Sequence, residues 1–156
     1  GNYLRDIEAE DFGAILIRFK NGAIGIVEGT ACVYPKNLEE TLSIFGETGC
    51  AVIGGLAVNR VQTWQFEKPA PQDEVVAKLA GTDPKDVYGS GHNLLYANYI
   101  HAVNTHTQPL VSGYEGIKAL KIILAAYKSQ KTGQAVKFDG LEFASTDMCT
   151  ADVKVK

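Results

Sequence analysis

The most regular hydrophobic pattern in the chain lies between residues 112 and 133. Apolar side chains there recur at steps of three and four residues, which predicts one amphipathic helix: Ile117, Leu120, Ile123, Leu124 and Tyr127. Ser112 and Glu115 have the spacing of a capping box, in which each side chain binds a backbone N–H of the first turn. Lys128 and Lys131 suit the negative end of the helix dipole, and Gly133 suits the left-handed position that ends a helix.

Five apolar stretches in the first half of the chain, at residues 12–19, 23–33, 38–45, 50–53 and 58–66, predict strands. Their connections are short, so we expect a largely antiparallel meander. Asn21 and Gly22 separate the first two strands and favour a type I′ turn, in which both central residues have positive φ. One face of the second strand carries small side chains, which favours close approach of another sheet or a ligand: Ala23, Gly25, Val27, Gly29 and Ala31.

The second half of the chain is mainly helical by pattern. Residues 92–104 predict another amphipathic helix, with a short helix at 73–80 before it and a short final strand at 135–138. Strands followed by helices indicate an α+β fold, here an open, mostly antiparallel β-sheet with helices packed on one face. The first strand is apolar on both faces. Its other face then needs a cover, from a second copy of the chain or from a missing domain.

Length, net charge and the longest aliphatic run indicate how many domains to expect and argue against nucleic-acid-binding and membrane-spanning proteins. With 156 residues, the chain is expected to form a single α+β domain at 1–138, followed by a weakly patterned C-terminal tail at 139–156. The net charge is −3 and there is no basic run, which argues against a nucleic-acid surface. The longest aliphatic run, residues 122–126, is far shorter than the ~20 residues of a membrane span.

The three cysteines, Cys32, Cys50 and Cys149, are an odd count and are widely spaced. This usage favours reduced thiols over a disulfide framework or a zinc site. We therefore expect a cytoplasmic protein.

Two groups of polar residues at strand ends are candidate ligand contacts. Lys36 and Asn37 follow the strand with the small-residue face, where they could bind a carboxylate, a phosphate or sugar hydroxyls; a solvated turn is the alternative. Arg60 alternates with Trp64 along the fifth strand, which predicts a charged pocket with an aromatic wall; a buried or interfacial ion pair is the alternative.

A glycine loop before the second amphipathic helix gives a third candidate. Gly89, Gly91 and Leu94 begin like a dinucleotide fingerprint, but the third glycine is missing and no strand directly precedes the loop. His92 and Asn93 at the start of the helix remain candidates for a ligand contact, His92 also for a proton carrier, beside a purely structural role. The three histidines do not have metal-ligand spacing, so no metal site is expected.

Two sets of short motifs carry a family resemblance. The first set is EDFGA at 10–14, FKNGA at 19–23 and IFGETG at 44–49; the second is YGSGH at 88–92, PLVSGYEG at 109–116 and AYKSQKTG at 126–133. Their order and spacing resemble the C-terminal domain of the glucose–fructose oxidoreductase, inositol dehydrogenase and rhizopine catabolism (Gfo/Idh/MocA) family. The YGSGH stretch is similar to the branch that oxidises nucleotide-linked amino sugars.

The resemblance implies an NAD(P)-dependent dehydrogenase with an N-terminal Rossmann domain, which binds NAD or NADP, and a C-terminal sheet whose free face commonly joins subunits. This chain has no intact fingerprint and begins too late to hold the family's catalytic helix, so no catalytic or cofactor-binding residue is assigned. Glu67-Lys68-Pro69 matches a family motif in letters but falls in the wrong domain, and we interpret it as coincidence.

Two functions follow as hypotheses. The first is the substrate-binding and oligomerisation domain of a sugar or nucleotide-sugar dehydrogenase, separated from its Rossmann domain and inactive alone. The second is a free-standing ligand-binding or assembly module without catalytic activity.

Overall fold

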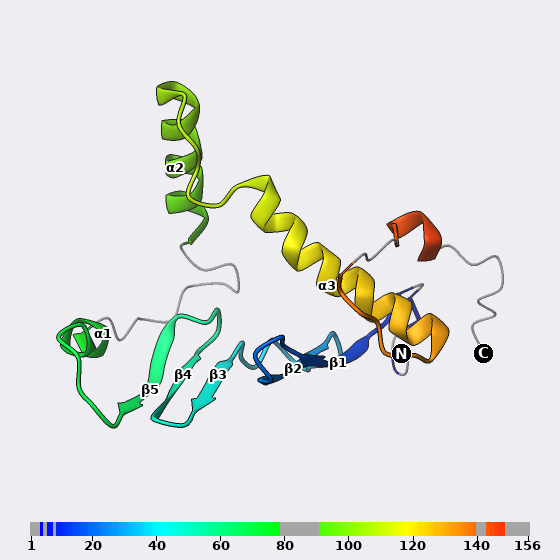
Figure 1. Cartoon of the computed structure of the whole chain (residues 1–156), viewed down its shortest axis with the longest axis horizontal. Coiled ribbons are helices and arrows are strands. Elements are labelled where there is room, and N and C mark those ends of the chain that lie inside the picture. The colour runs from blue at the N-terminus through cyan, green and yellow to red at the C-terminus, as the bar shows by residue number, and fades with distance from the viewer. Residues whose placement is uncertain (1–3, 5, 8, 79–90, 140–142, 149–156) are drawn as a thin grey trace. The chain divides into compact units, whose positions relative to one another are not determined.

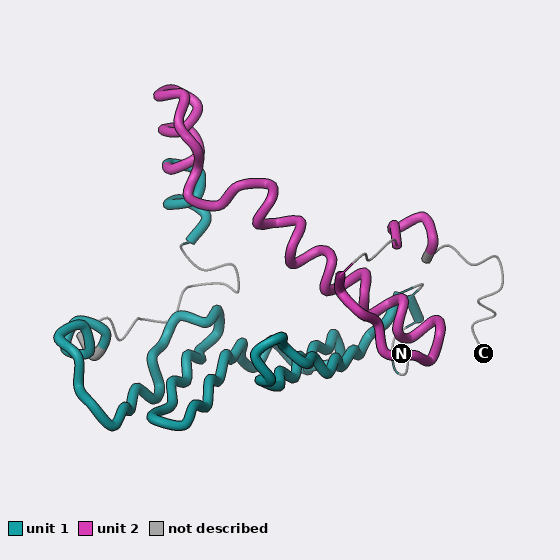
Figure 2. Tube along the Cα trace, in the orientation of Figure 1, with its two compact units in different colours: residues 1–97 teal, residues 98–156 magenta. Residues whose placement is uncertain are grey.

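A computed structural model describes the chain except for residues 1–3, 5, 8, 79–90, 140–142 and 149–156. It divides into two compact units, residues 1–97 and 98–156, which Figure 2 distinguishes by colour. The described elements are antiparallel strands followed by helices, so the predicted α+β class is confirmed. The five strands form two sheets, one of two strands and one of three.

The first sheet is a hairpin of β1 (Phe12–Arg18) and β2 (Ile24–Thr30), as the Asn-Gly signal predicted. The turn type differs from the prediction. Gly22 has a φ of 91°, but Asn21 is not among the residues with positive φ, and the Gly22 N–H donates to the Phe19 carbonyl at 3.0 Å. The loop is therefore a type I turn closed by a glycine, the common three-residue hairpin loop. The Asn21 side chain stabilises it by accepting the Ala23 N–H at 3.1 Å.

The small-residue face of β2 does permit close approach, in this case of the protein itself. A β-carbon added to Gly25 would lie 3.0 Å from the ring of Phe19. The opposite face of the hairpin carries three apolar side chains that are open to solvent: Leu16 is 74% exposed, Ile24 59% and Ile26 77%. The register pairs Leu16 with Ile26 and Arg18 with Ile24, so the three apolar side chains share one face.

The second sheet has the order β3-β4-β5, with β3 at Leu42–Gly46, β4 at Gly49–Gly54 and β5 at Arg60–Phe66 (Figure 1). β3 and β4 are joined by the predicted tight turn at residues 47–48. β5 begins two residues later than predicted because Val58 has a φ of 49°, a conformation that a strand does not continue through.

Asp11, just before β1, anchors the start of the hairpin and was not predicted from sequence. It is only 1% exposed. Its carboxylate accepts the Leu4 N–H at 2.6 Å, and its backbone carbonyl accepts the Ala31 N–H at 2.8 Å and the Thr30 hydroxyl at 3.0 Å. The Leu4 N–H is one of the partners that a buried carboxylate requires, and the two bonds to the carbonyl tie the start of β1 to the end of β2.

In the described residues, three α-helices follow the strands. α1 spans Asp73–Lys78, α2 spans Gly91–Thr105 and α3 spans Gly113–Thr132; a 3₁₀ turn, η1, covers Ser145–Met148. The existence of all three predicted helices is confirmed. In the second unit, Asn98 of α2 accepts the Leu110 N–H at 2.8 Å, which ties the loop between the last two helices to α2.

The ends of α3 confirm one prediction and correct another. Gly133 ends the helix in the left-handed region, with φ 65° and ψ 18°, and its N–H donates to the Ser129 carbonyl at 2.8 Å. The capping box is wrong: Ser112 occupies the cap position but makes no side-chain cap bond. Instead, Lys118 Nζ donates to both carboxylate oxygens of Glu115, at 2.7 and 2.8 Å. The Lys118 ammonium lies one helical turn away and competes successfully with the backbone N–H for the Glu115 carboxylate.

The predicted strand at residues 135–138 is also wrong, since these residues have no regular structure. The chain is held near the helix end by local bonds instead: Ser129 Oγ donates to the Gln134 carbonyl at 2.8 Å. The C-terminal tail contributes η1, whose Asp147 carbonyl accepts a bond from Lys131 Nζ at 2.6 Å.

Few side chains are buried in the described part of the chain. The buried apolar residues are Ala51 and Ala102, whereas the predicted apolar stripes of α2 and α3 are largely exposed, for example Tyr99 at 58% and Leu120 at 51%. The packing of helices on one sheet face and the single domain at 1–138 remain predictions. No helix in the described residues is long and apolar enough to cross a membrane.

Candidate functional site

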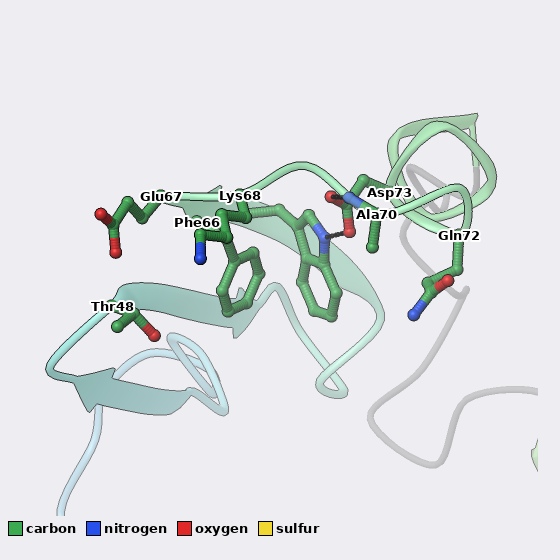
Figure 3. A pocket seen from close by; sticks show the side chains of 8 residues that line it. Thr48, Phe66, Glu67, Lys68, Ala70, Gln72 and Asp73 are labelled. Atoms are coloured by element: carbon green, nitrogen blue, oxygen red, sulfur yellow. Dashed lines mark hydrogen bonds between the residues drawn. The ribbon is translucent and has the colours of Figure 1, made fainter.

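A pocket of about 320 Å³ lies where β5 ends and the chain turns into α1 (Figure 3). We call it the Trp64 pocket. Aromatic, amide, hydroxyl and charged side chains line it together: Thr48, Trp64, Phe66, Glu67, Lys68, Ala70, Gln72 and Asp73. Its volume falls at the lower end of the range typical of small-molecule sites.

Asp73 holds the indole of Trp64 in place. The Trp64 Nε1–H donates to Asp73 Oδ1 at 2.9 Å, and the Ala70 N–H donates to Asp73 Oδ2 at 2.6 Å. The Asp73 N–H in turn donates to the Ala70 carbonyl at 2.9 Å, which closes a small ring of bonds at the start of α1. The Ala70 bond first, and the Trp64 bond second, hold the pKa of Asp73 below its ordinary value, so the carboxylate stays charged.

The second aromatic wall is Phe66, two residues along the same face of β5. Its ring meets that of Trp64 edge to face, with centroids 5.1 Å apart and planes at 69°. The turn between β3 and β4 is tied to this wall because the Glu67 N–H donates to the Thr48 carbonyl at 2.8 Å. The Trp64 wall is therefore held by the Asp73 carboxylate, and the Thr48 side of the pocket is held by a backbone hydrogen bond.

The five residues predicted as ligand contacts lie elsewhere. Lys36 and Asn37 are exposed in the connection between β2 and β3, Arg60 begins β5, and His92 and Asn93 are exposed in the first turn of α2. None of the five lines the Trp64 pocket. Their role in ligand binding remains a prediction.

The predicted pairing of Arg60 with Trp64 on one strand face is wrong. Arg60 pairs with Gly54 and Trp64 with Ala51, and a β-bulge shifts the register between Val52 and Ile53. Because side chains alternate along β4, positions 51 and 54 lie on opposite faces, and so do their partners. A bulge cannot be recognised from the alternation of residues in one strand.

Gly89 of the predicted glycine loop lies outside the described residues, with all of 79–90, and Gly91 is the first residue of α2. The ring of His92 lies 6.4 Å from that of Tyr96, one turn further along α2. Within the described ranges, no group of three or more His, Cys, Asp or Glu side chains is placed to hold a metal ion.

Sequence reasoning missed Thr48, Gln72 and Asp73 as pocket residues. One signal was available: an aspartate at the start of a predicted helix is a common first-turn residue, and Asp73 is such a residue. That its carboxylate would also bind the chain's single tryptophan depends on the path of the loop between them. Glu67 and Lys68, interpreted as a coincidental motif match, line this pocket.

Comparisons with known proteins identify the family. Residues 2–138 match the model of the oxidoreductase family's C-terminal alpha/beta domain, GFO_IDH_MocA_C. No curated protein matches the chain significantly.

Two of the solved structures that match cover most of this chain. They are the WlbA dehydrogenases from Chromobacterium violaceum (36% identity, TM-score 0.70, 83% of this chain) and Bordetella pertussis (38%, 0.73, 85%), both in complex with NADH and UDP-GlcNAcA. The match covers 35% and 38% of those two chains, so this chain spans little more than a third of their length. The match over residues 2–138 shows that the chain belongs to the Gfo/Idh/MocA oxidoreductase family, as a C-terminal α/β domain.

Proposed function

We propose that the chain is the substrate-binding and oligomerisation domain of an NAD(P)-dependent dehydrogenase that acts on a nucleotide-linked sugar. The observation that carries this proposal is the likeness to two WlbA dehydrogenases, at 36% and 38% identity over more than four fifths of the chain. Both relatives hold NADH and UDP-GlcNAcA. A shared domain at this level of identity supports a shared class of substrate.

The substrate contacts that we propose are Lys36, Asn37, Arg60, His92 and Asn93. Lysine and arginine supply the charge that a diphosphate requires, and amide and imidazole groups can bind sugar hydroxyls. All five are exposed side chains in loops or at the ends of regular elements, where rigid scaffolds usually present binding residues.

The cofactor and the catalytic groups are assigned to a Rossmann domain outside this chain. In that arrangement NAD or NADP would accept the hydride, and residues of this domain would bind and orient the sugar. The described cysteines, Cys32 and Cys50, are free thiols, which supports the cytoplasmic location expected from their spacing.

The test compares this chain alone with a single polypeptide that contains both a Rossmann domain and this chain, which we call the joined protein. We expect the joined protein to reduce NAD⁺ when UDP-GlcNAcA is added, followed by NADH absorbance, and the chain alone to show no turnover. Calorimetry should find no tight NADH binding to the chain alone. Micromolar NADH binding by the chain alone would contradict the proposal that the cofactor binds to the Rossmann domain.

Alanine substitution of the five proposed contacts in the joined protein tests the substrate side. At least one of them should raise KM or lower kcat by about tenfold, the cost of a charge-assisted bond. Lys121→Ala, an exposed lysine in the middle of α3, serves as the control for loss of a surface charge. Unchanged kinetics in all five variants would remove the assignment.

The alternative is a free-standing ligand-binding or assembly module. The exposed apolar side chains of Leu16, Ile24 and Ile26 favour this alternative, because a partner protein could cover them whether or not the chain belongs to an enzyme. The reading frame that encodes the chain separates the two functions: an upstream strand–turn–helix unit with the glycine fingerprint supports the dehydrogenase, and a start codon at this N-terminus supports the module.

A further inference from the structure

We propose that the Trp64 pocket is a binding site for an uncharged pyranose sugar ring. The site is separate from the five substrate contacts proposed above, none of which lines it. The pocket combines two aromatic walls with a hydroxyl and an amide, and these groups match the two faces that a pyranose presents. Its C–H groups are weakly positive and suit the negative face of an aromatic ring, whereas its hydroxyls need polar partners.

The arrangement of the walls argues against a flat ligand. A nucleobase is held best between parallel surfaces, but the Trp64 and Phe66 planes meet at 69° with centroids 5.1 Å apart. The two rings therefore form a corner and not a slot. A puckered ring can lie against one wall while its edge meets the other.

The charges of the pocket argue against an anion. Two residues with carboxylates, Glu67 and Asp73, and one with an ammonium, Lys68, line the pocket. Asp73 is kept ionised by its bonds to Ala70 and Trp64, so the local balance is negative. A phosphate or carboxylate ligand would be repelled, whereas an uncharged polyol would not.

The backbone that carries two polar side chains of the pocket is held in position before a ligand arrives. The backbone of Thr48 is tied to Glu67, and the backbone carbonyl of Gln72 accepts the N–H groups of Val75 and Val76 at 3.1 and 3.0 Å. The side chains of both residues line the pocket (Figure 3). Because these backbones are fixed, ligand binding has to order only two side chains, which lowers its entropic cost.

The chain supplies its own probe, because Trp64 is its single tryptophan. Tryptophan fluorescence of the full chain is followed during titration with methyl β-glucopyranoside and, separately, with uridine monophosphate. We expect a saturable change with the glycoside in the millimolar range and none with the nucleotide. No saturable change with the glycoside, or binding of the nucleotide alone, would overturn the proposal.

Gln72→Ala tests the polar contact while leaving the fluorophore in place. It should weaken glycoside binding about fivefold, the equivalent of one ordinary hydrogen bond. Gln130→Ala, the same substitution at an exposed position of α3, should leave binding unchanged. If Gln72→Ala loses its native circular dichroism spectrum, Thr48→Val replaces it, with the same expected direction. Equal affinity in the wild-type chain and in a folded pocket variant would overturn the proposal.

This test is independent of the dehydrogenase assay. A chain that binds no glycoside at Trp64 can still serve as the substrate domain of an active joined enzyme. Equally, a chain that binds the glycoside at Trp64 can belong to a joined protein that shows no dehydrogenase activity.

Discussion

At the scale of single residues, the best-defined arrangement is the bond between the Trp64 indole and Asp73. One carboxylate accepts both this N–H and that of Ala70, so it joins a strand side chain to the loop that begins α1. Each bond favours the ionised form of Asp73, whereas desolvation favours the neutral form and is the weakest of the three influences. The position of the aromatic wall therefore depends on the charge of one side chain.

Acid should release Trp64 from Asp73 at a pH below 3.8. The folded-state pKa of Asp73 lies below its ordinary value of 3.8. The stabilisation from the charged form is therefore complete above the unfolded pKa and is lost as the pH falls through the folded pKa. Tryptophan fluorescence during acid titration should show a transition centred below 3.8 that is absent in Asp73→Asn. A transition centred at or above 3.8 would contradict the assignment.

The exposed pair of Glu115 and Lys118 shows what a surface bond contributes by comparison. Their side chains are 53% and 68% exposed and lie one helical turn apart. Pairs of this kind stabilise a helix by about 0.2–0.5 kcal/mol. The pair explains why the Glu115 carboxylate is bonded to Lys118 and not to the backbone of the first turn, but it contributes little to the stability of α3.

At the scale of elements, two glycines of α3 and its C-terminal cap differ in backbone conformation. Gly133 has positive φ and ends the helix, whereas Gly116 lies inside the first turns with no atom within 4 Å of an added β-carbon. The same substitution to alanine should thus have opposite effects at the two positions.

Gly133→Ala should lower the free energy of unfolding by about 1 kcal/mol, because an alanine in the left-handed region is strained. Gly116→Ala should raise it by about 0.5–1 kcal/mol, because alanine loses less backbone entropy in a helix. Urea denaturation followed by circular dichroism measures both. A stabilising Gly133→Ala would mean that α3 does not end at this residue.

The central strand of the three-stranded sheet, β4, begins at another glycine that its neighbour β5 approaches closely. A β-carbon on Gly49 would lie 2.5 Å from the Gln65 carbonyl oxygen and 3.0 Å from the Phe66 α-carbon, both backbone atoms of β5. Backbone atoms can move away only by separating β4 from β5.

Gly49→Ala should therefore lower the free energy of unfolding by about 1–3 kcal/mol, and it should shift the Trp64 fluorescence because Phe66 moves with its backbone. Gly29→Ala on β2 is the matched control, since no atom lies within 4 Å of the added carbon. It should change the stability by less than about 0.5 kcal/mol. Equal effects of the two substitutions in the same urea titrations would show that β4 and β5 are not packed as closely as the register implies.

At the scale of the whole molecule, the dominant feature is apolar surface in contact with solvent. Large hydrophobic side chains are exposed on the first hairpin and on both long helices, including Leu16, Ile26, Tyr99 and Leu120. Monomeric proteins rarely leave contiguous apolar patches of more than a few hundred Å² uncovered. Each of these faces therefore requires a cover.

We predict that the open face of the β1–β2 hairpin joins two copies of the chain, so that light scattering finds a discrete dimer or tetramer. A standard interface buries about 800 Å² per partner, and at about 25 cal/mol per Å² of apolar area the gross gain exceeds the cost of association. Ile26→Lys should shift the population toward monomer by placing a charge in the contact. A clean monomer of the wild-type chain at micromolar concentrations would remove this prediction, and polydisperse aggregate would indicate a missing domain as the cover.

The sequence by itself determined the features that depend on neighbours a few residues apart. The hairpin at Asn21-Gly22, the end of α3 at Gly133 and the apolar stripes of α2 and α3 all follow from local backbone preference and periodicity. The family resemblance also came from short motifs in order, and the match over residues 2–138 confirms it.

Only the tertiary structure decided which distant groups meet. The bulge that separates Arg60 from Trp64, the bond of Trp64 to Asp73 and the bond of Asp11 to the Leu4 N–H depend on strand register and loop paths. A pattern along one strand or helix carries no information about such choices, because each depends on atoms supplied by another part of the chain.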